Sequence, residues 1–420
     1  MRIAISTAVY YPQINGVAVF SHNLAVGLAK RGHEVIVIAP SQTGKNYART
    51  RDGVKVHYLR SVDVKVYPDQ INAVPRKKKV MGVELPHLFY RKGLRVSVFP
   101  QLEVKKILDE FHPGVVHVQV SDPIGLSVVG WARRHDVPVV TTEHNQPEVL
   151  TDSLKMPKFV KNSTNVLLSA YFRNRQSKSD FVTMPTKQAI MNLLKEKELG
   201  VPIVAVSNGV DLTNFKPGKV PDEFYRKHGL VKGQPIVLYV GRVDPEKQVD
   251  LVIEAFKQAR TKLPKTEVEP VLMVVGDGVD RVRLQKLAAK LGLGDAVKFL
   301  GKVLPPELYE VYQAGTVFAT ASEIETQGIV LIEAAATGLP LIAVNRGAVA
   351  EVCQNGKNGY LCEPGKVTEI AEAMVKILRD KSLREKFARE SLKIAGEHDF
   401  EKSLDQFINI YQRVAGKNMV

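Results

Sequence analysis

Two cations stand close together directly after an apolar run that has the length of a strand. The run is Ile236–Val240, and Arg242 and Lys247 follow it. In an open parallel sheet, the carboxyl ends of the strands border the crevice that binds ligands. A guanidinium can bind two phosphate oxygens and an ammonium is a compact positive charge, so the pair suits a diphosphate group that gains negative charge as its bond breaks. The alternative is a strand-end turn with a solvated lysine.

A second anion site is predicted where a helix begins. The apolar run Val317–Ala319 is followed by a loop, and a helix is expected to start around Gly328 and to end before Gly338. The backbone N–H groups of Gly328, Ile329 and Val330 would then lack acceptors within the helix. Such groups, aided by the helix dipole, bind phosphate or carboxylate. We therefore expect these three residues to contact a diphosphate.

Two glutamates accompany the start of this helix. Glu325 lies in the preceding loop, beside the predicted anion site, and Glu333 lies inside the helix. The neighbours of Glu333 are almost all apolar, and a carboxylate in such surroundings usually has a partner. Glu333 could accept two hydrogen bonds from a ribose diol, as acidic residues do in nucleotide-binding folds. The alternative is an ordinary helical glutamate.

In the first half of the chain, His144 and Gly16 occupy comparable positions. His144 follows the apolar run Val137–Thr142, which places it at the edge of the crevice by the same strand-end rule. An imidazole there can hydrogen-bond a sugar or orient a reacting hydroxyl, whereas the alternative is a structural histidine in a loop. Gly16 ends the loop after the first predicted strand, Ile3–Ile5, and would let the backbone approach a phosphate.

The elements that must position these residues follow one pattern twice. Apolar runs of strand length alternate with amphipathic helical stretches over residues 1–205, and the pattern restarts over residues 206–398. This alternation is typical of α/β domains with a doubly wound parallel sheet. We therefore expect two Rossmann-like domains that face each other across a cleft. Residues 399–420 are predicted to form an amphipathic helix that packs back towards the first domain.

The composition is that of a globular protein. The chain has 420 residues, of which 45% are hydrophobic and 25% charged, which is enough for two cores. No stretch approaches the length needed to cross a bilayer, and we interpret the first residues as a strand and not as a signal peptide. Cys353 and Cys362 are the two cysteines, and we expect free thiols in a reducing cytoplasm.

The net charge of +15 lies almost wholly in the first half. Residues 1–205 hold 29 Lys and Arg against 16 Asp and Glu, a surplus of +13. Nucleic acid, acidic lipid and phosphorylated substrates are all compatible with this surplus, and a basic surface that only aids solubility is the alternative. The segment Pro75–Phe99 interleaves basic and aromatic residues, which suits a membrane-interface patch or a solvated loop with a short helix. No zinc spacing or recognition-helix signature supports nucleic-acid binding.

Glu325 and Glu333, with seven residues between them, resemble the E-x7-E motif of the family four retaining glycosyltransferases. Other motifs of the chain are also similar to motifs of this family and occur in the same order along the sequence. The resemblance extends from about Met1 to Glu363, and the motifs taken together are specific for the family. The other motifs are Gly241-Arg242 with Lys247, Gly276-Asp277-Gly278, Ser207-Asn208-Gly209-Val210-Asp211 and Asn358-Gly359-Tyr360-Leu361.

The resemblance implies the GT-B fold, with a first domain that binds the acceptor and a second domain that binds a nucleotide-sugar. Arg242 and Lys247 would hold the donor diphosphate, Glu333 the ribose, and Glu325 the transferred sugar. His144 resembles the active-site histidine of this family. The sequence has no D-x-D triplet, the usual metal–diphosphate signature of the other main glycosyltransferase fold, which agrees with a site that needs no metal and no other cofactor.

The resemblance assigns a ligand contact to one glycine motif and leaves the role of a second one open. Many relatives have two glycines where this chain has Asn15-Gly16, so only Gly16 is carried over as a diphosphate contact. Gly276-Asp277-Gly278 follows the apolar run Val271–Val275, where a tight structural turn and a nucleotide contact are equally compatible with the sequence.

The sequence therefore predicts a retaining hexosyltransferase. It would move glucose or a related hexose from a nucleotide-sugar, with UDP favoured, to a hydroxyl of a membrane lipid such as diacylglycerol. The variant Glu325-Thr326-Gln327-Gly328 resembles members that glucosylate diacylglycerol and related mannosylating members. No residue stands out as a nucleophile, which favours front-face attack. We expect a cytoplasmic enzyme that lies on the inner face of an anionic membrane and has no nucleic acid as a partner.

Several alternatives accompany this prediction. One is a GDP-mannose-dependent mannosyltransferase that acts on phosphatidylinositol, or on a soluble or polysaccharide acceptor. Another is a sugar-nucleotide epimerase of the same fold, and a third is a nucleic-acid-binding protein without enzymatic activity. The sequence alone leaves the nucleobase, the hexose, the linkage and the oligomeric state open.

Overall fold

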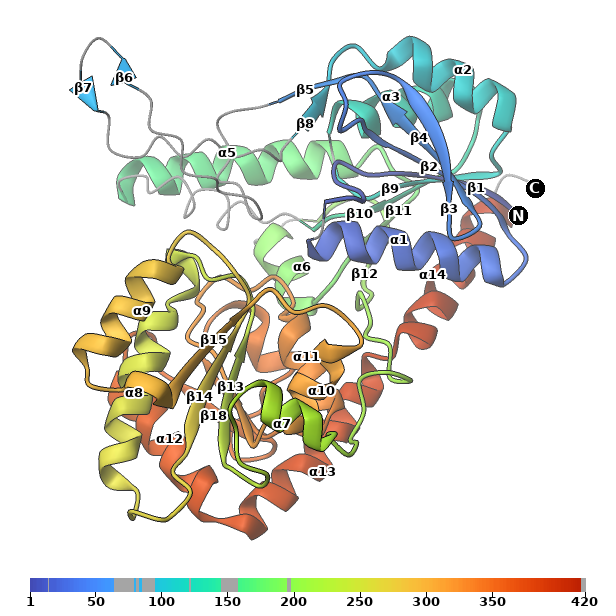
Figure 1. Cartoon of the computed structure of the whole chain (residues 1–420). Helices are drawn as coiled ribbons and strands as arrows, with labels where there is room; N and C mark the ends of the chain where they lie inside the picture. Colours follow the sequence, from blue (N-terminus) through green and yellow to red (C-terminus); the bar gives the residue numbers. More distant parts are fainter. Residues whose placement is uncertain are drawn as a thin grey trace. The chain divides into compact units, whose positions relative to one another are not determined.

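The computed structural model describes residues 1–13, 15–63, 79–80, 83–84, 95–120, 122–144, 158–194 and 198–416. Most of the basic and aromatic segment Pro75–Phe99 lies outside these residues. The chain forms two compact units (Figure 1), namely Met1–Ser207 with Ser403–Val420, and Asn208–Lys402. The first division, after Ser207, lies two residues beyond the boundary expected at residue 205.

The first unit is built on a sheet of eight strands within the described residues, in the order β12-β11-β10-β9-β1-β2-β4-β3. Neighbouring strands are parallel, except that β3 and β4 form an antiparallel hairpin. These strands are β1 (Arg2–Ser6), β2 (Glu34–Pro40), β3 (Tyr47–Arg51), β4 (Val54–Leu59), β9 (Val115–Val118), β10 (Val139–Thr142), β11 (Phe181–Met184) and β12 (Ile203–Ala205). Two short strand pairs lie outside this sheet, β5 (Ser61–Asp63) with β8 (Arg95–Ser97) and β6 (Lys79–Val80) with β7 (Val83–Glu84).

Helices cover both faces of this sheet, which is why its strands are short apolar runs. One face packs on α2 (Gln101–Phe111) and α3 (Pro123–Arg134) in a single apolar cluster. The opposite face is covered by α1 (Gly16–Lys30) and α14 (Phe400–Gly416), whose aromatic rings contact each other and the ring of His117. The other helices in the described part of this unit are α5 (Lys158–Gln176) and α6 (Lys187–Leu194).

The second unit has a parallel six-stranded sheet within the described residues, in the order β15-β14-β13-β16-β17-β18. Counted along the chain, this is the order 3-2-1-4-5-6 of a dinucleotide-binding sheet. Its strands are β13 (Ile236–Val240), β14 (Val271–Val275), β15 (Val297–Gly301), β16 (Val317–Ala319), β17 (Leu341–Val344) and β18 (Gly359–Cys362). Its helices are α7 (Asp222–Lys227), α8 (Val249–Lys262), α9 (Arg281–Lys290), α10 (Glu307–Ala314), α11 (Ile329–Ala336), α12 (Val367–Arg379) and α13 (Lys381–Glu397), with the short 3-10 turns η1 (Pro245–Lys247), η2 (Gly294–Ala296) and η3 (Gly347–Glu351).

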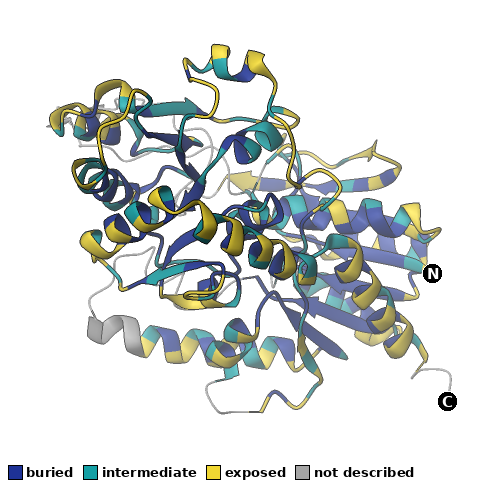
Figure 2. Cartoon of the chain, turned by 90° about the horizontal axis from the view of Figure 1, so that it is seen from below, coloured by how far each residue is buried: buried dark blue, intermediate teal, exposed yellow. Residues whose placement is uncertain are grey.

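Two apolar layers enclose the second sheet, because successive side chains of a strand point to opposite faces. In β13, Leu238 belongs to one layer, whereas Val237 and Tyr239 belong to the other. Figure 2 shows the result, with buried positions along the strands and exposed positions on the outer sides of the helices. The carboxyl ends of the strands are thereby fixed in place for the loops that follow them.

The helix α14 completes the core of the first unit. Leu404, Phe407 and Tyr411 are buried at helical spacing. The ring of Phe407 lies 5.7 Å from that of Phe20 in α1, measured between centroids. Burial of such an aromatic ring contributes strongly to a core. The last helix therefore stabilises a unit whose other elements all precede residue 208.

Replacing Phe407 with alanine should destabilise the first unit by about 3–5 kcal/mol, because it leaves a cavity in the core. Urea unfolding followed by tryptophan fluorescence measures this loss, since the single tryptophan, Trp131, lies in α3 of the same unit. The matched control is Gln406→Ala, at an exposed position of the same helix, which should change the unfolding free energy by less than about 0.5 kcal/mol. Equal losses in the two variants would contradict this packing role.

Candidate active site

In the second unit, the candidate residues follow two adjacent strands at the point where the winding of the sheet reverses. β13 lies between β14 and β16, and the chain passes to β14 on one side and returns to β16 on the other. The loops after β13 and β16 therefore leave neighbouring strand ends in opposite directions, which opens the usual ligand crevice of such sheets. Arg242 and Lys247 lie after β13, and Glu325 and Gly328 lie after β16.

Lys247 and Glu325 form an ion pair that joins the two loops. The Lys247 Nζ atom lies 2.7 Å from Glu325 Oε1, and both side chains are only 15% exposed. The same ammonium donates to the carbonyl oxygen of Ile324 at 3.2 Å. Lys247 is thus hydrogen-bonded to the backbone of Ile324, which precedes Gly328 by four residues in the chain. The predicted cation and the start of α11 therefore both belong to the loops at the carboxyl ends of the strands.

Arg242 is more engaged than the sequence suggested. Its guanidinium pairs with Asp244 and with Glu246, whose Oε1 atom lies 2.7 Å from Nη2. Burial lowers the pKa of Arg242, but the attraction of the Glu246 and Asp244 carboxylates is larger in sum, so the pKa lies above the usual value. The hydroxyl of Tyr239 donates to the carbonyl oxygen of Arg242 at 2.6 Å and fixes the backbone of the turn. Arg242 is therefore positioned by its own loop, with its charge partly balanced there.

The helix α11 begins one residue later than expected, at Ile329. Gly328 is its N-cap, in the left-handed region with a φ of +75°, which favours glycine. The carbonyl oxygen of Gly328 accepts the N–H groups of Leu331 and Ile332. The N–H groups of Gly328, Ile329 and Val330 have no backbone acceptor among the described residues. The predicted set of three donors is therefore present at this helix end.

Glu333 has a specific partner that sequence reasoning missed. The hydroxyl of Tyr312, in α10, donates to Glu333 Oε2 at 2.5 Å. Burial raises the pKa of Glu333 to about 7, although this hydrogen bond acts in the opposite direction. The ring of Tyr312 is fully buried, with its centroid 5.6 Å from that of Phe215. The carboxyl group is thus held in one orientation and is poised to ionise near neutral pH.

The glycines after β13 and β14 allow two loops to approach each other closely. A Cβ atom on Gly276 would lie 1.8 Å from the carbonyl oxygen of Gly241, and one on Gly278 would lie 2.2 Å from that of Val243. Real Cβ atoms never come so close, so both positions require glycine. Both glycines of Gly276-Asp277-Gly278 are therefore required by packing. They let this turn lie directly against the loop that carries Arg242 and Lys247.

In the first unit, Gly16 lies at the reversal point of the other sheet. It begins α1, after β1, and β1 lies between β9 and β2. Asn15 caps this helix, since its Oδ1 atom accepts the N–H of Ala18 at 2.8 Å. A Cβ atom on Gly16 would meet no atom within 4 Å. The backbone is therefore not covered by protein atoms on that side, and the contact of Gly16 with a diphosphate stays a prediction.

His144 is buried two residues beyond the end of β10, with only 8% of its surface exposed. Its Nε2 atom lies 2.8 Å from Oε1 of Gln119, which directly follows the neighbouring strand β9. Its ring meets that of Phe20 edge to face, with centroids 5.4 Å apart. Burial lowers the pKa of His144 to about 4, so the imidazole is neutral at physiological pH. It is therefore suited to accept or donate a hydrogen bond, and not to supply a positive charge.

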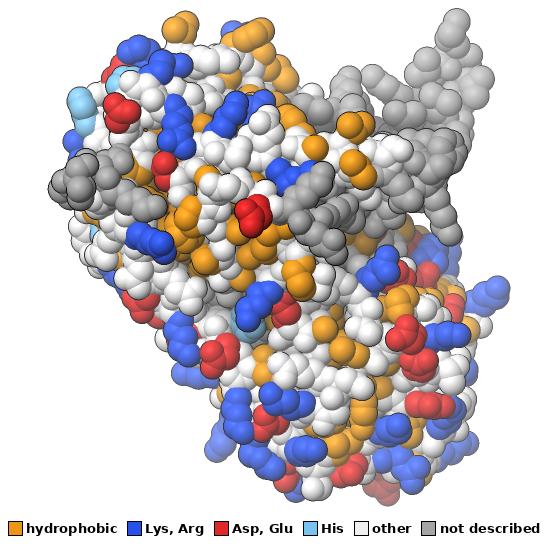
Figure 3. Space-filling view, turned by 180° about the vertical axis from the view of Figure 1, so that it is seen from behind, with side chains coloured by type: hydrophobic (Ala, Val, Ile, Leu, Met, Phe, Trp, Pro, Cys, Tyr) orange, Lys and Arg blue, Asp and Glu red, His pale blue; other side chains and the backbone are white. Residues whose placement is uncertain are grey.

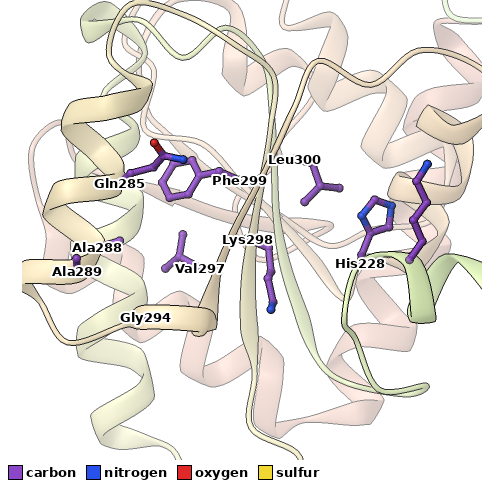
Figure 4. A pocket seen from close by; sticks show the side chains of 10 residues that line it. His228, Gln285, Ala288, Ala289, Gly294, Val297, Lys298, Phe299 and Leu300 are labelled. Carbon is purple, nitrogen blue, oxygen red and sulfur yellow. The ribbon is translucent and has the colours of Figure 1, made fainter.

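A cavity of about 490 Å³ in the second unit lies away from these residues. Figure 4 shows its lining, which comes from β15, from α9 and from His228 at the end of α7. β15 is an edge strand and is separated from β13 by β14. This cavity therefore does not border the loops that carry Lys247 and Glu325.

The described residues show neither a membrane-spanning helix nor a cluster of metal ligands. None of the described helices combines the length and the apolar character needed to span a bilayer. No group of three or more His, Cys, Asp or Glu side chains in the described part is placed to hold a metal ion. Whether the site works without a metal remains a prediction, because the diphosphate itself could supply metal ligands.

Two family descriptions match the two halves of the chain. Residues 14–214 match "Glycosyltransferase Family 4", and residues 221–394 match "Glycosyl transferases group 1". A GDP-mannose-dependent alpha-mannosyltransferase of Mycolicibacterium smegmatis is 31% identical over 366 residues, which cover 86% of this chain and 84% of that protein. An alpha-monoglucosyldiacylglycerol synthase of Streptococcus pneumoniae is 26% identical over 427 residues, which cover 100% of this chain and 89% of that protein.

A similar fold is found in solved structures. Sucrose-phosphate synthase from Thermosynechococcus elongatus superposes with a TM-score of 0.73, at 20% identity, over 99% of each chain. This likeness concerns the fold alone. With both halves matched in chain order and a relative above 30% identity along most of the chain, the protein belongs to glycosyltransferase family four and is a glycosyltransferase of the GT-B fold.

Proposed function

We propose that this glycosyltransferase moves a hexose from a nucleotide-sugar, with a UDP-sugar favoured, to a hydroxyl of a membrane lipid such as diacylglycerol, with retention of the anomeric configuration. One observation carries the donor part of the proposal. Lys247 and Glu325 form an ion pair between the loops after β13 and β16, where the winding of a nucleotide-type sheet reverses, and Glu325 lies three residues before the N-cap of α11. Glu333, four residues into α11, belongs to the same helix.

Each group has a task that its surroundings support. Lys247 and the N–H groups of Gly328, Ile329 and Val330 stabilise the diphosphate as it gains charge on leaving. Arg242 adds donors, since a guanidinium has five N–H groups and its two carboxylate partners leave some of them free to bind phosphate.

Two carboxylates recognise the sugars of the donor in this proposal. Glu333 accepts the hydroxyls of the ribose, while Tyr312 keeps one carboxylate oxygen in place. Glu325 contacts the transferred hexose and is itself oriented by Lys247. Neither carboxylate acts as a covalent nucleophile in this proposal. Retention of the anomeric configuration then requires the acceptor to attack on the face from which the diphosphate departs. His144 hydrogen-bonds the hexose or orients the acceptor hydroxyl, and Gly16 lets the backbone approach the diphosphate.

The lipid acceptor rests on charge and on relatives. Residues 1–205 carry the surplus of +13, whereas Figure 3 shows basic and acidic side chains interspersed over the second unit. Two relatives at 26% identity, from Streptococcus pneumoniae and Acholeplasma laidlawii, are named alpha-monoglucosyldiacylglycerol synthases. A basic first domain would draw the enzyme to an anionic membrane, where such an acceptor resides.

A second candidate is a GDP-mannose-dependent mannosyltransferase. Its support is that two mycobacterial relatives with this name are 28% and 31% identical to the chain. Both candidates use the same diphosphate and ribose contacts, and they differ in the base, the hexose and the acceptor. A soluble acceptor is the third outcome to test, since a relative named N-acetyl-alpha-D-glucosaminyl L-malate synthase is 26% identical.

A donor panel tests the proposal directly. Release of UDP or GDP is measured with UDP-glucose, UDP-galactose, UDP-N-acetylglucosamine and GDP-mannose, with vesicles that contain diacylglycerol or phosphatidylinositol, and with EDTA present. We expect turnover with one nucleotide class, dependence on the lipid and no loss with EDTA, because cationic side chains and N–H groups serve the diphosphate in this proposal. Abolition of turnover by EDTA would contradict the metal-free part, and turnover of no donor would contradict the whole.

Donor binding should depend on pH through Glu333. Burial raises the pKa of its carboxyl to about 7, and only the ionised form accepts both ribose hydroxyls. Affinity for the intact nucleotide-sugar, whose diphosphate does not titrate in this range, should therefore rise from about pH 6 to about pH 8. Glu333→Gln should lose this pH dependence and bind about 10- to 100-fold more weakly at the higher pH, as measured by isothermal titration calorimetry.

His144→Ala is the contrasting variant for this experiment. It should keep the donor affinity and its pH dependence but lower kcat by about 100-fold or more. A pH dependence that persists in Glu333→Gln, or that disappears in His144→Ala, would assign the titration to another group.

Membrane binding is tested by flotation of the full chain with lipid vesicles in low salt. Vesicles that contain phosphatidylglycerol should carry more protein than vesicles of phosphatidylcholine alone, and added salt should release it, because salt screens exposed charges. Equal binding to both kinds of vesicle would remove the electrostatic part of the proposal.

A further inference from the structure

Buried polar side chains line one face of the first sheet, between β9, β10 and β11. A parallel sheet that is covered on both faces normally carries apolar residues there, and a buried polar group is costly unless it is hydrogen-bonded. The register places Thr142 beside Thr183 on the adjacent strand. We call this row the polar ladder, and it consists of His117, Gln119, Thr142, His144 and Thr183, all buried.

Tyr411 of α14 determines the protonation of His117, the first histidine of the ladder. Its hydroxyl lies 2.6 Å from His117 Nδ1, and His117 is its only hydrogen-bond partner in the described part of the chain. If Nδ1 were the donor, the hydroxyl proton would be buried without an acceptor among the described residues, which is costly, so we assign the hydroxyl as the donor to Nδ1. With this assignment the proton of His117 is on Nε2, which donates to Thr142 Oγ1 at 2.7 Å, and Thr142 Oγ1 lies 2.6 Å from Thr183 Oγ1.

The ring of His117 in turn orients the amide of Gln119. The Gln119 Nε2 atom lies 3.3 Å from Nδ1 and 3.2 Å from Nε2 of His117. An atom so nearly equidistant from both nitrogens lies above the ring, since a position in the plane would overlap the carbon between them. The face of an aromatic ring is electron-rich, so it attracts the amide N–H groups and repels the amide oxygen. The oxygen therefore faces away from His117, towards His144.

This orientation sets the protonation of His144. Its Nε2 atom lies 2.8 Å from Gln119 Oε1, and an oxygen with no proton accepts only from an N–H. The neutral ring then carries its single proton on Nε2, and the lone pair is on Nδ1. No second hydrogen bond of His144 to a described residue occupies that lone pair.

We propose that Gln119 is a positioning residue that holds His144 as the Nε2–H tautomer and so presents the Nδ1 lone pair to a hydroxyl of the substrate. The identity of that hydroxyl rests on the proposed function, whereas the tautomer does not. His144 then accepts a hydrogen bond and orients the hydroxyl by it, while Tyr411, His117 and Gln119 keep the ring from exchanging its two nitrogens.

The groups around His144 agree with a neutral ring. His117 approaches from β9, and burial lowers its pKa to about 3. Tyr411 approaches the ladder from α14 and α1 contributes the ring of Phe20, neither of which is charged. Glu143, the preceding residue, is the nearest described carboxylate along the chain, and it accepts a hydrogen bond from Gln176 of α5 at 3.4 Å.

The tautomer is read directly by long-range ¹H–¹⁵N correlation spectra of the full chain labelled with ¹⁵N-histidine, without any substrate. The signals of His144 are assigned by their loss in His144→Gln. We expect a protonated Nε2 and an unprotonated Nδ1 in the wild type, and a mixture of tautomers in Gln119→Leu. A protonated Nδ1 in the wild type, or an unchanged tautomer in Gln119→Leu, would overturn the inference.

Kinetics then separate positioning from a structural role. Gln119→Leu should lower kcat about 10- to 100-fold with little change in the KM for the donor. Gln119→Glu keeps an acceptor at the same place and should restore most of kcat near neutral pH. Its carboxylate raises the pKa of the adjacent imidazole, so the acid limb of the pH–rate profile should move to higher pH. An unshifted acid limb would contradict contact between Gln119 and the active ring.

The matched control is Thr141→Val, in β10, the strand that leads to His144; its side chain lies on the face of the sheet opposite to Thr142 and the polar ladder. Thr141 is buried and its Oγ1 atom lies 2.7 Å from Ser179 Oγ, so this variant also loses a buried hydrogen bond. Equal losses of kcat in Thr141→Val and Gln119→Leu would mean that Gln119 acts through stability alone. The NMR result is independent of activity, so failure of the proposed function would leave the tautomer in place, and a wrong tautomer would overturn the inference even in an active enzyme.

Discussion

The ion pair between Lys247 and Glu325 is the interaction on which the proposed donor site depends. It joins the loops after β13 and β16, and both partners are largely removed from water. Such a pair is stable only where additional hydrogen bonds offset the loss of hydration, and the carbonyl oxygen of Ile324 provides one. In the function proposed above, an incoming diphosphate shares this ammonium with Glu325. On that proposal, the ammonium binds the intact donor less tightly than an unpaired lysine would, and more of its attraction acts when the leaving diphosphate is fully charged.

Much of the fold and part of the site followed from local sequence. Alternating strands and helices fix parallel sheets, and the strand-end rule then brought Lys247 and Glu325 to adjacent strands, where the structure places them in contact. Tyr312 and Tyr411 could not be found in this way. Tyr411 is 294 residues from His117, and no periodicity states which distant helix covers a strand. Gln119 was within reach, since it directly follows β9 as His144 follows β10.

Other differences have local causes. The sequence analysis did not anticipate the ion pairs of Arg242, whose guanidinium pairs with Asp244 and Glu246, two and four residues further along a short turn. The hairpin of β3 and β4 was not anticipated, because β3 is mostly exposed and lacks an apolar face. Periodicity detects buried faces, so it misses an edge strand that lies in solvent.

The path of α14 has a consequence for how the protein is made. The first unit consists of residues 1–207 and of the last residues from Ser403 onward, with the second unit inserted between them in the chain. While a ribosome is still synthesising residues 208–402, the face of the sheet that bears His117 is covered by α1 but lacks the aromatic side chains of α14. The nascent first unit is therefore exposed to misfolding and to chaperones until α14 has been synthesised, whereas the second unit can fold as one continuous segment.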